Sequence, residues 1–177
     1  MNKGQYIEPV EHYALLRHVV GLCGAGVALE FGVAKGDSTR IIAESLPVIG
    51  FDSFEGLPED WRPGYPKGKF AHDPPEIDNC TLVTGLFADT LPGFHFESLG
   101  RISLVHLDAD LYSSTALALE HVGPHLQAGA YLVFDEFHGY AGCEEHEMRA
   151  FNEFVSRTGF QYSSIAHSHE AFAVKIV

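Results

Sequence analysis

The sequence predicts an α/β fold with a doubly wound sheet of seven strands, mostly parallel and closed by an antiparallel hairpin. Short apolar runs rich in Val, Ile, Leu and Phe recur along the 177 residues, and segments with helical periodicity separate them. This alternation is typical of parallel strands covered by helices on both faces, as in Rossmann-like sheets. The length favours a single domain over residues 1–177.

Seven apolar runs have the length and composition of buried strands. They are Val27–Gly32, Val48–Asp52, Cys80–Thr84, Ile102–Asp108, Ala130–Asp135, Phe160–Ala166 and Ala171–Val177. Only the polar turn 167–170 separates the last two runs. A turn this short cannot make a parallel crossover, so the last two strands must pair antiparallel.

Four segments show apolar residues that return at intervals of three and four, which predicts helices. They are Val10–Leu22, Asp37–Glu44, Ser113–Leu126 and Glu144–Thr158. Ser113 is a favourable N-terminal capping residue, and Gly159 is a favourable stop for the last helix. Residues 1–26 are therefore expected to form a short N-terminal helical segment.

One stretch, residues 53–79, interrupts the alternation with five prolines, three glycines and several aromatic residues. Long loops without secondary structure are usually functional or disordered in compact domains. Because Trp61, Tyr65 and Phe70 can pack together, we expect an ordered flap.

The charge balance disfavours two classes of partner. Eleven Lys and Arg residues against 24 Asp and Glu residues give a net charge of −13, which repels nucleic-acid phosphates and anionic lipids. The N-terminus lacks the pattern of a signal peptide, and no apolar run has the length of a membrane span. Three widely spaced cysteines indicate free thiols, so a cytoplasmic protein is expected.

The turn after the first predicted strand carries glycines where an open α/β sheet binds its ligand. Gly32 and Gly36 allow close approach of backbone and ligand, although the spacing is not that of GxGxxG. Glu30, at the end of the strand, suits a ligand with an ammonium group or hydroxyls. Asp52 ends the next strand, where ribose-binding sheets place a carboxylate.

Four acidic residues follow the fourth and fifth predicted strands: Asp108, Asp110, Asp135 and Glu136. Neighbouring parallel strands bring these carboxylates together, which is costly unless a cation compensates them. A hard divalent cation such as Mg²⁺ is one solution. Capping of the following helices is the alternative reading of these acids.

Several of these strings resemble the macrocin O-methyltransferase family over Val27–Val177. The resemblance is carried by FDSFEGLP (51–58), TLP (90–92), LDADLYSST (107–115) and DEF (135–137). The string EFGVAKGDS (30–38) is similar to that of cation-dependent catechol-type O-methyltransferases. The resemblance implies a class I methyltransferase fold, the cofactor S-adenosylmethionine, Mg²⁺, and methyl transfer to a hydroxyl of a small molecule such as a sugar.

The resemblance also implies roles for individual residues. Glu30, Gly32 and Gly36 would flank the methionine part of the cofactor, Ser38 would bind its carboxylate, Asp52 its ribose and Phe87, within 85–89, its adenine; Asp108 would also contact it. The metal ligands would be Asp108, Asp135 and Glu136. The catalytic residues would be Asp108, Asp110 and His138, with Asp110 or His138 accepting the proton.

The chain departs from the family pattern at three places. Asp135–Glu136 replaces an aspartate pair, Ala109 replaces a glycine, and a longer N-terminal lid is missing ahead of residue 27. The 53–79 flap or a second subunit, in a homodimer, would supply the missing wall. The alternatives are a metal-independent methyltransferase, a binding protein without turnover and, less well supported without GxGxxG, a dinucleotide oxidoreductase.

Overall fold

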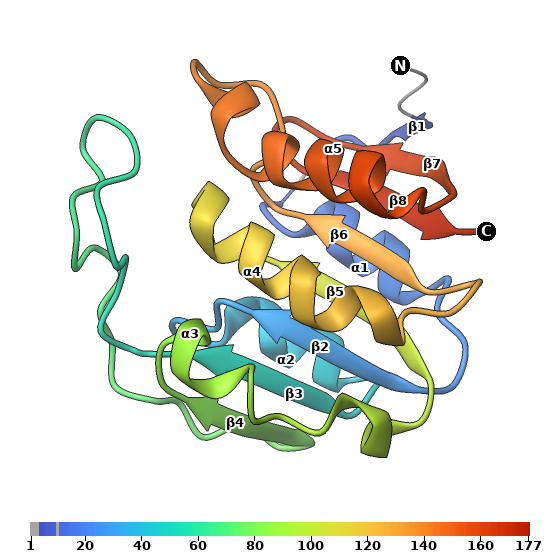
Figure 1. The fold of residues 1–177 in the computed structure, drawn as a ribbon, viewed down its shortest axis with the longest axis horizontal. Coiled ribbons are helices and arrows are strands. Elements are labelled where there is room, and N and C mark those ends of the chain that lie inside the picture. The colour runs from blue at the N-terminus through green and yellow to red at the C-terminus, as the bar shows by residue number, and fades with distance from the viewer. Residues whose placement is uncertain (1–3, 10) are drawn as a thin grey trace.

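The computed structural model describes residues 4–9 and 11–177 (Figure 1). Val10, the predicted start of the first helix, and residues 1–3 of the expected N-terminal segment lie outside the described residues.

A single sheet forms the centre of the molecule, with the strand order β1-β7-β8-β6-β5-β2-β3-β4. Every pairing is parallel except the two made by β8, which runs antiparallel to β6 and β7. The strands are β1 (Gln5–Tyr6), β2 (Val27–Phe31), β3 (Val48–Asp52), β4 (Cys80–Thr84), β5 (Ile102–Leu107), β6 (Tyr131–Phe134), β7 (Tyr162–His167) and β8 (Phe172–Ile176). The mostly parallel sheet and its antiparallel C-terminal hairpin are thus confirmed.

The described part of the sheet has eight strands, one more than the seven predicted. The additional strand, β1, is two residues long and pairs with β7 through Gln5 and Ala166 and through Tyr6 and His167. Two residues are too few to show an alternating pattern, so this edge strand has no recognisable signal in the sequence.

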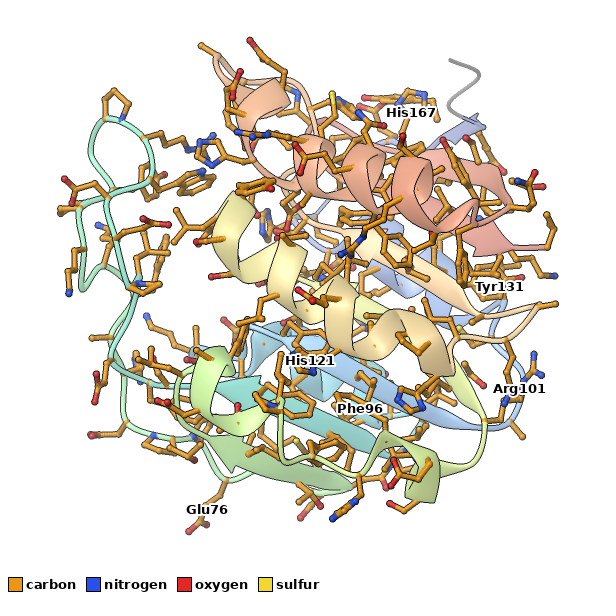
Figure 2. The ribbon with its side chains drawn as sticks, viewed as in Figure 1. Glu76, Phe96, Arg101, His121, Tyr131 and His167 are labelled. Carbon is orange, nitrogen blue, oxygen red and sulfur yellow. The ribbon has the colours of Figure 1, made fainter. Side chains whose placement is uncertain are left out.

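Helices cover both faces of the sheet (Figure 1). They are α1 (Ala14–Val20), α2 (Asp37–Ala43), α3 (Phe87–Thr90), α4 (Tyr112–Val122) and α5 (Glu147–Thr158), together with the 3₁₀ turns Phe96–Leu99, Gly123–His125 and Cys143–Glu145. Side chains of α4 and α5 fill the space above one face (Figure 2), where Phe134 and Phe151 are fully buried. On the other face α1 and α2 pack against Ala28, Leu104 and Val133.

Residues 53–79 form a loop without helix or strand that projects beside the sheet (Figure 1). Leu57 and Trp61 of this flap pack with Leu111 in a small apolar cluster separate from the main core. The guanidinium carbon of Arg62 lies 4.0 Å from the Trp61 ring centroid and 4.4 Å from that of Tyr140. The flap is therefore attached to the rest of the protein by apolar packing on Leu111 and by the cation–π contact of Arg62 with Tyr140.

Two further findings concern the whole described chain. None of its described helices has the length and apolar character needed to cross a membrane. Cys23, Cys80 and Cys143 are free thiols.

Candidate active site

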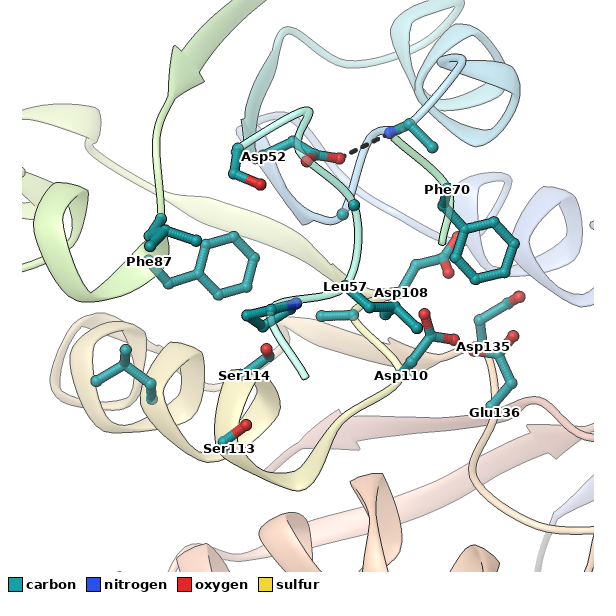
Figure 3. A pocket seen from close by; sticks show the side chains of 18 of the residues that line it. Asp52, Leu57, Phe70, Phe87, Asp108, Asp110, Ser113, Ser114, Asp135 and Glu136 are labelled. Atoms are coloured by element: carbon teal, nitrogen blue, oxygen red, sulfur yellow. Dashed lines mark hydrogen bonds between the residues drawn. The ribbon is translucent and has the colours of Figure 1, made fainter. Parts of the chain in front are cut away.

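A cavity of about 400 Å³ opens at the carboxyl ends of the parallel strands (Figure 3). Five of its lining residues end or directly follow a strand: Gly32 after β2, Asp52 in β3, Gly85 after β4, Asp108 after β5 and Asp135 after β6. Ligands of open α/β sheets bind at this edge, near the point where the strand order reverses between β2 and β5. The cavity therefore lies where the fold places a ligand.

Asp52 fixes the turn after β2. Its Oδ2 accepts hydrogen bonds from the backbone N–H groups of Val33 and Ala34, each at 2.8 Å. Its Oδ1 accepts another from Phe54 N–H at 2.7 Å, at the root of the flap. A carboxylate has about four lone-pair positions, so Asp52 keeps acceptor capacity for a ligand in the cavity.

The same turn depends on Gly32. Its φ is +96°, and a β-carbon there would overlap the carbonyl oxygen of Asp108. Gly32 lines the cavity. Ser38 is buried at the start of α2 and lines a neighbouring hollow, together with Lys35 and Lys69. Gly36 caps α2 with a φ of +79°, and it is not among the described residues that line either hollow.

Phe87 lines the end of the cavity nearest β4 (Figure 3), and its role at the adenine, implied by the family resemblance, stays a prediction. It lies at the start of α3, a short helix that the sequence did not predict. Its ring packs edge-on against Phe31, with 5.5 Å between the centroids. Phe87 thus presents an apolar surface opposite the acidic end of the cavity.

Glu30 is placed differently from the prediction. Along β2, Leu29 and Phe31 face α4 and α5, so Glu30 points to the opposite face with Ala28. There it is fully buried, and one carboxylate oxygen lies 2.9 Å from Nδ1 of His106. Glu30 is therefore not among the described residues of the cavity lining.

An acidic cluster forms the other end of the cavity. Single oxygens of Asp108, Asp110 and Glu136 lie within 4.8 Å of one another. Ligand atoms of His106, Asp108 and Asp135 satisfy the same limit, so the predicted metal ligands fall into two groups that share Asp108. Figure 3 shows these carboxylates converging below the flap.

Burial and mutual repulsion perturb these acids. Desolvation, and then the charge of Asp135, raise the pKa of Asp110 to about 7, although the nearby positive charge of Arg62 opposes the shift. The pKa of Asp108 and that of Glu136 lie well above the usual range, again because of burial and then the neighbouring carboxylates. Without a cation, the cluster therefore favours protonated carboxyls.

Three backbone positions at the cavity are strained. Ala34, Phe70 and Asp110 all line it with positive φ values, of 45°, 70° and 61°. Residues other than glycine rarely adopt this conformation, and such strain concentrates at functional sites.

Sequence reasoning missed several residues that shape the site. His12 and Tyr13, ahead of α1, line the cavity, and Nε2 of His12 lies 3.1 Å from Asp135. Glu147, fully buried in the first turn of α5, accepts a hydrogen bond from Glu136 N–H at 3.1 Å. His12, Tyr13 and Glu147 belong to no sequence motif that could have indicated them. His106 could have been found, because alternation along β5 places it on the same face as Asp108.

His138, a predicted catalytic residue, is buried and is not among the described residues that line the cavity. Its backbone N–H donates to the carbonyl of Glu170 at 3.0 Å, and its ring contacts that of His167. The loop after β6 turns toward the β7–β8 hairpin at Phe137 and His138, whose backbone N–H groups both donate to the carbonyl of Glu170.

Comparisons with known proteins agree with this geometry. The sequence model of the macrocin-O-methyltransferase (TylF) family matches residues 75–161. A Streptomyces olivaceus protein described as 8-demethyl-8-(2,3-dimethoxy-alpha-L-rhamnosyl)-tetracenomycin-C 4'-O-methyltransferase is 30% identical over 141 residues, or 63% of this chain and 53% of that protein. The chain thus spans about half the length of this curated relative.

Solved structures show the same fold. The calicheamicin methyltransferase CalS11 superposes with a TM-score of 0.71 at 22% identity, covering 93% of this chain and 76% of that one. An O-methyltransferase from Bacillus cereus in complex with SAH superposes with a TM-score of 0.55 at 15% identity, covering 94% and 78%. The chain therefore has the fold of these methyltransferases, and the resemblance that its sequence motifs indicated agrees with the match of the macrocin-O-methyltransferase (TylF) family model to residues 75–161.

Proposed function

We propose that this chain is an S-adenosylmethionine-dependent O-methyltransferase that is assisted by a divalent cation and acts on a hydroxyl of a small sugar-like or natural-product-like molecule. One observation carries the proposal: a single cavity joins Gly32, Asp52 and Phe87, which suit the cofactor, to a cluster of convergent carboxylates. The methyl donor and an activated hydroxyl would meet between these two ends.

The cofactor end supports S-adenosylmethionine. Asp52 retains acceptor capacity for the ribose hydroxyls, and Phe87 offers an apolar face for the adenine. The neighbouring hollow with Ser38, Lys35 and Lys69 has the polar and positive groups that a carboxylate needs. The Bacillus cereus relative, of the same fold, holds SAH.

The residues of the acidic end fit a divalent cation. Oε2 of Glu136 is buried and has no hydrogen-bond partner among the residues described, and the pKa of Asp108 is raised by burial and by its acidic neighbours. A cation would satisfy the lone oxygen and offset the repulsion. We assign its binding to Asp108, which belongs to both groups of ligand atoms, with Asp135 or Glu136 as a further oxygen ligand of the kind that suits Mg²⁺. When bound, such an ion acts as a Lewis acid that lowers the pKa of a hydroxyl and holds it in place.

The chain's own residues would orient the transfer. The bond between sulfur and the methyl carbon breaks as the bond between the acceptor oxygen and that carbon forms, and the hydroxyl proton passes to a carboxylate. We assign proton acceptance to Asp110, because it lines the cavity whereas His138 does not. The products are S-adenosylhomocysteine and a methyl ether.

The acceptor side combines apolar and polar groups. Leu57, Pro58 and Phe70 of the flap form an apolar wall, and Ser113 and Ser114 of α4 add hydroxyls. This mixture suits a neutral, hydroxylated ring, in keeping with the sugar-containing natural product in the Streptomyces olivaceus relative's description. The flap and His12 already supply walls, so the expected homodimer stays a prediction that the cavity does not require.

Calorimetric titration with S-adenosylmethionine and with S-adenosylhomocysteine, each with Mg²⁺ and with EDTA, tests the cofactor. We expect micromolar binding. Transfer of a labelled methyl group to a panel of hydroxylated sugars and phenols then tests turnover, with Asp108→Asn as the variant and Asp73→Asn, an exposed flap residue, as the matched control.

Each outcome separates the alternatives. Methyl transfer that is lost in EDTA and in Asp108→Asn, but kept in Asp73→Asn, supports the cation-assisted reaction. Full transfer in EDTA indicates a metal-independent methyltransferase, and binding without transfer to any acceptor indicates a binding protein. Absence of cofactor binding would overturn the proposal.

A further inference from the structure

We propose that His106, Asp108 and Asp135 form a mixed nitrogen and oxygen site for a divalent transition-metal ion, with Glu30 holding the imidazole in place. The inference rests on the cation half of the proposed function and deepens it, because it names a ligand and a class of metal. None of the sequence motifs pointed to a nitrogen ligand.

The sheet brings the three side chains together. His106, on β5, lies two residues before Asp108, which directly follows the strand, so alternation points both side chains to the same face. In the register of β5 and β6, His106 pairs with Val133, two residues before Asp135. One ring nitrogen and one oxygen from each carboxylate consequently lie within 4.8 Å of one another. Ligands bound at about 2.1 Å to one ion lie closer than this, so only a small inward movement is needed.

Glu30 pairs with His106, the nitrogen ligand of this group, inside the protein. The two residues are register partners on β2 and β5, and both side chains are 0% exposed. Nδ1 of His106 lies 2.9 Å from Glu30 Oε1, whereas its Nε2 is buried without a hydrogen-bond partner among the described residues. A buried polar atom without a partner is costly, and a metal ion would satisfy it.

The arrangement of carboxylate, imidazole and cation site is the one that metal-binding histidines commonly use. A carboxylate that accepts the proton of one ring nitrogen fixes the tautomer and leaves the other nitrogen free to bind the metal. Glu30 is in the position to do this for His106. Glu30 would therefore act on the metal through His106 and be a positioning residue.

The ligand set decides the class of metal. Imidazole together with carboxylates suits Mn²⁺, Fe²⁺, Co²⁺ or Zn²⁺ better than Mg²⁺ or Ca²⁺, which prefer oxygen alone. The second group, Asp108 with Asp110 and Glu136, offers only oxygen. Asp108 belongs to both groups, so it cannot distinguish them. Nitrogen coordination of the ion indicates the group with His106, and its absence indicates the group with Asp110 and Glu136.

Titration of the purified protein with Mn²⁺, followed by electron paramagnetic resonance, tests the inference. We expect Mn²⁺ to bind with nitrogen couplings in the pulsed spectrum. His106→Gln should abolish these couplings, and Glu30→Gln should weaken Mn²⁺ binding about 10- to 100-fold. Circular dichroism of each variant establishes that it is folded.

Two control variants make the assignment specific. His12 is the other histidine beside Asp135, so His12→Gln should keep the nitrogen couplings. Asp110→Asn alters only the all-oxygen group and should keep them too. If His106→Gln does not fold, couplings that persist in His12→Gln, with weaker binding in Glu30→Gln, still support the assignment.

The outcomes separate this inference from the proposed function. Bound Mn²⁺ without nitrogen couplings, or couplings lost only in His12→Gln, would overturn the His106 site and leave the cation-assisted transferase intact. Absence of Mn²⁺ binding would overturn the site together with cation assistance. Calorimetric binding of S-adenosylmethionine in the same samples would still report on the transferase itself.

Discussion

The backbone of Gly32 passes so close to the carbonyl oxygen of Asp108 that there is no room for a β-carbon between them. This contact joins the turn that faces the proposed cofactor to the first residue of the acidic cluster. Because Asp108 N–H also donates to the carbonyl of Phe31 at 2.9 Å, the two loops are held together at one point.

Replacing Gly32 by alanine should therefore separate these loops. We expect Gly32→Ala to lower the free energy of unfolding by at least about 2 kcal/mol, because it adds a clash to an unfavourable φ. Denaturant unfolding measures the change. Gly93→Ala is the control, because a β-carbon on Gly93 would meet open space, and it should change stability by less than about 0.5 kcal/mol. Equal effects of the two substitutions would contradict the argument.

Asp52 makes a second prediction possible. In Asp52→Asn, an amide NH₂ replaces one of the two acceptor oxygens, so the N–H groups of Val33, Ala34 and Phe54 cannot all keep their partner. We expect a loss of about 1 to 3 kcal/mol in stability and, on the proposed function, at least about tenfold weaker binding of S-adenosylmethionine. Thermal unfolding and calorimetry measure the two effects. Asp73→Asn should change neither stability nor cofactor binding. Unchanged stability of Asp52→Asn would argue that these three hydrogen bonds do not hold the turn.

The sheet could be predicted because its central strands are continuous apolar runs that end in turn residues. Val27–Phe31 and Tyr131–Phe134 are buried along their whole length, as in a parallel sheet between two helical layers. The edge strand β1 and the short helix α3 could not be predicted, since each is formed by contacts with distant segments rather than by a local pattern.

The site was predictable only in part, for a related reason. Strand topology alone brings five acidic residues to one edge of the sheet, because Asp52 ends β3 and the others follow strand ends: Asp108, Asp110, Asp135 and Glu136. The side-chain direction of Glu30 follows from alternation along β2. The glycine-containing motif around Glu30 suggested contact with a bound ligand instead, so its pairing with His106 was not predicted. His12, just ahead of α1, and Glu147, in α5, reach the site from segments packed on opposite faces of the sheet, and no local pattern records that packing.

Arg62 should determine how firmly the flap is held. Its guanidinium packs on Trp61 and Tyr140 and lies 3.6 Å from Glu170 in the turn between β7 and β8. Such contacts stabilise by about 1 to 3 kcal/mol together, so Arg62→Ala should increase flap opening about 5- to 100-fold. Hydrogen exchange at the Trp61 and Leu57 amides, which bond within the flap, reports the opening.

Lys67 is the matched control for Arg62. It lies on the same flap with an exposed side chain, and Lys67→Ala should leave exchange unchanged. If Arg62→Ala exchanged at the wild-type rate, the flap would be held by its apolar cluster alone. On the proposed function, looser docking should raise KM for the acceptor more than it lowers kcat, since the flap forms a wall of the acceptor side.

The acidic cluster predicts how stability depends on pH when no cation is bound. Burial and the charge of Asp135 raise the pKa of Asp110 to about 7, against about 4 for an unfolded carboxyl. Between these values the folded state binds more protons than the unfolded state, so stability must fall as the pH rises. The raised pKa of His12, caused mainly by its hydrogen bond to Asp135, acts in the same direction at higher pH.

We therefore expect the protein in EDTA to lose several degrees of Tm between about pH 5 and about pH 8. Differential scanning calorimetry across this range measures the loss. Asp110→Asn, which cannot ionise, should reduce it, and Mn²⁺ or Mg²⁺ should restore Tm at the higher pH by neutralising the carboxylates. Asp73→Asn should follow the wild-type curve. A Tm that rises with pH in EDTA would show that these carboxyls are not destabilised by burial and that the cluster needs no compensating charge.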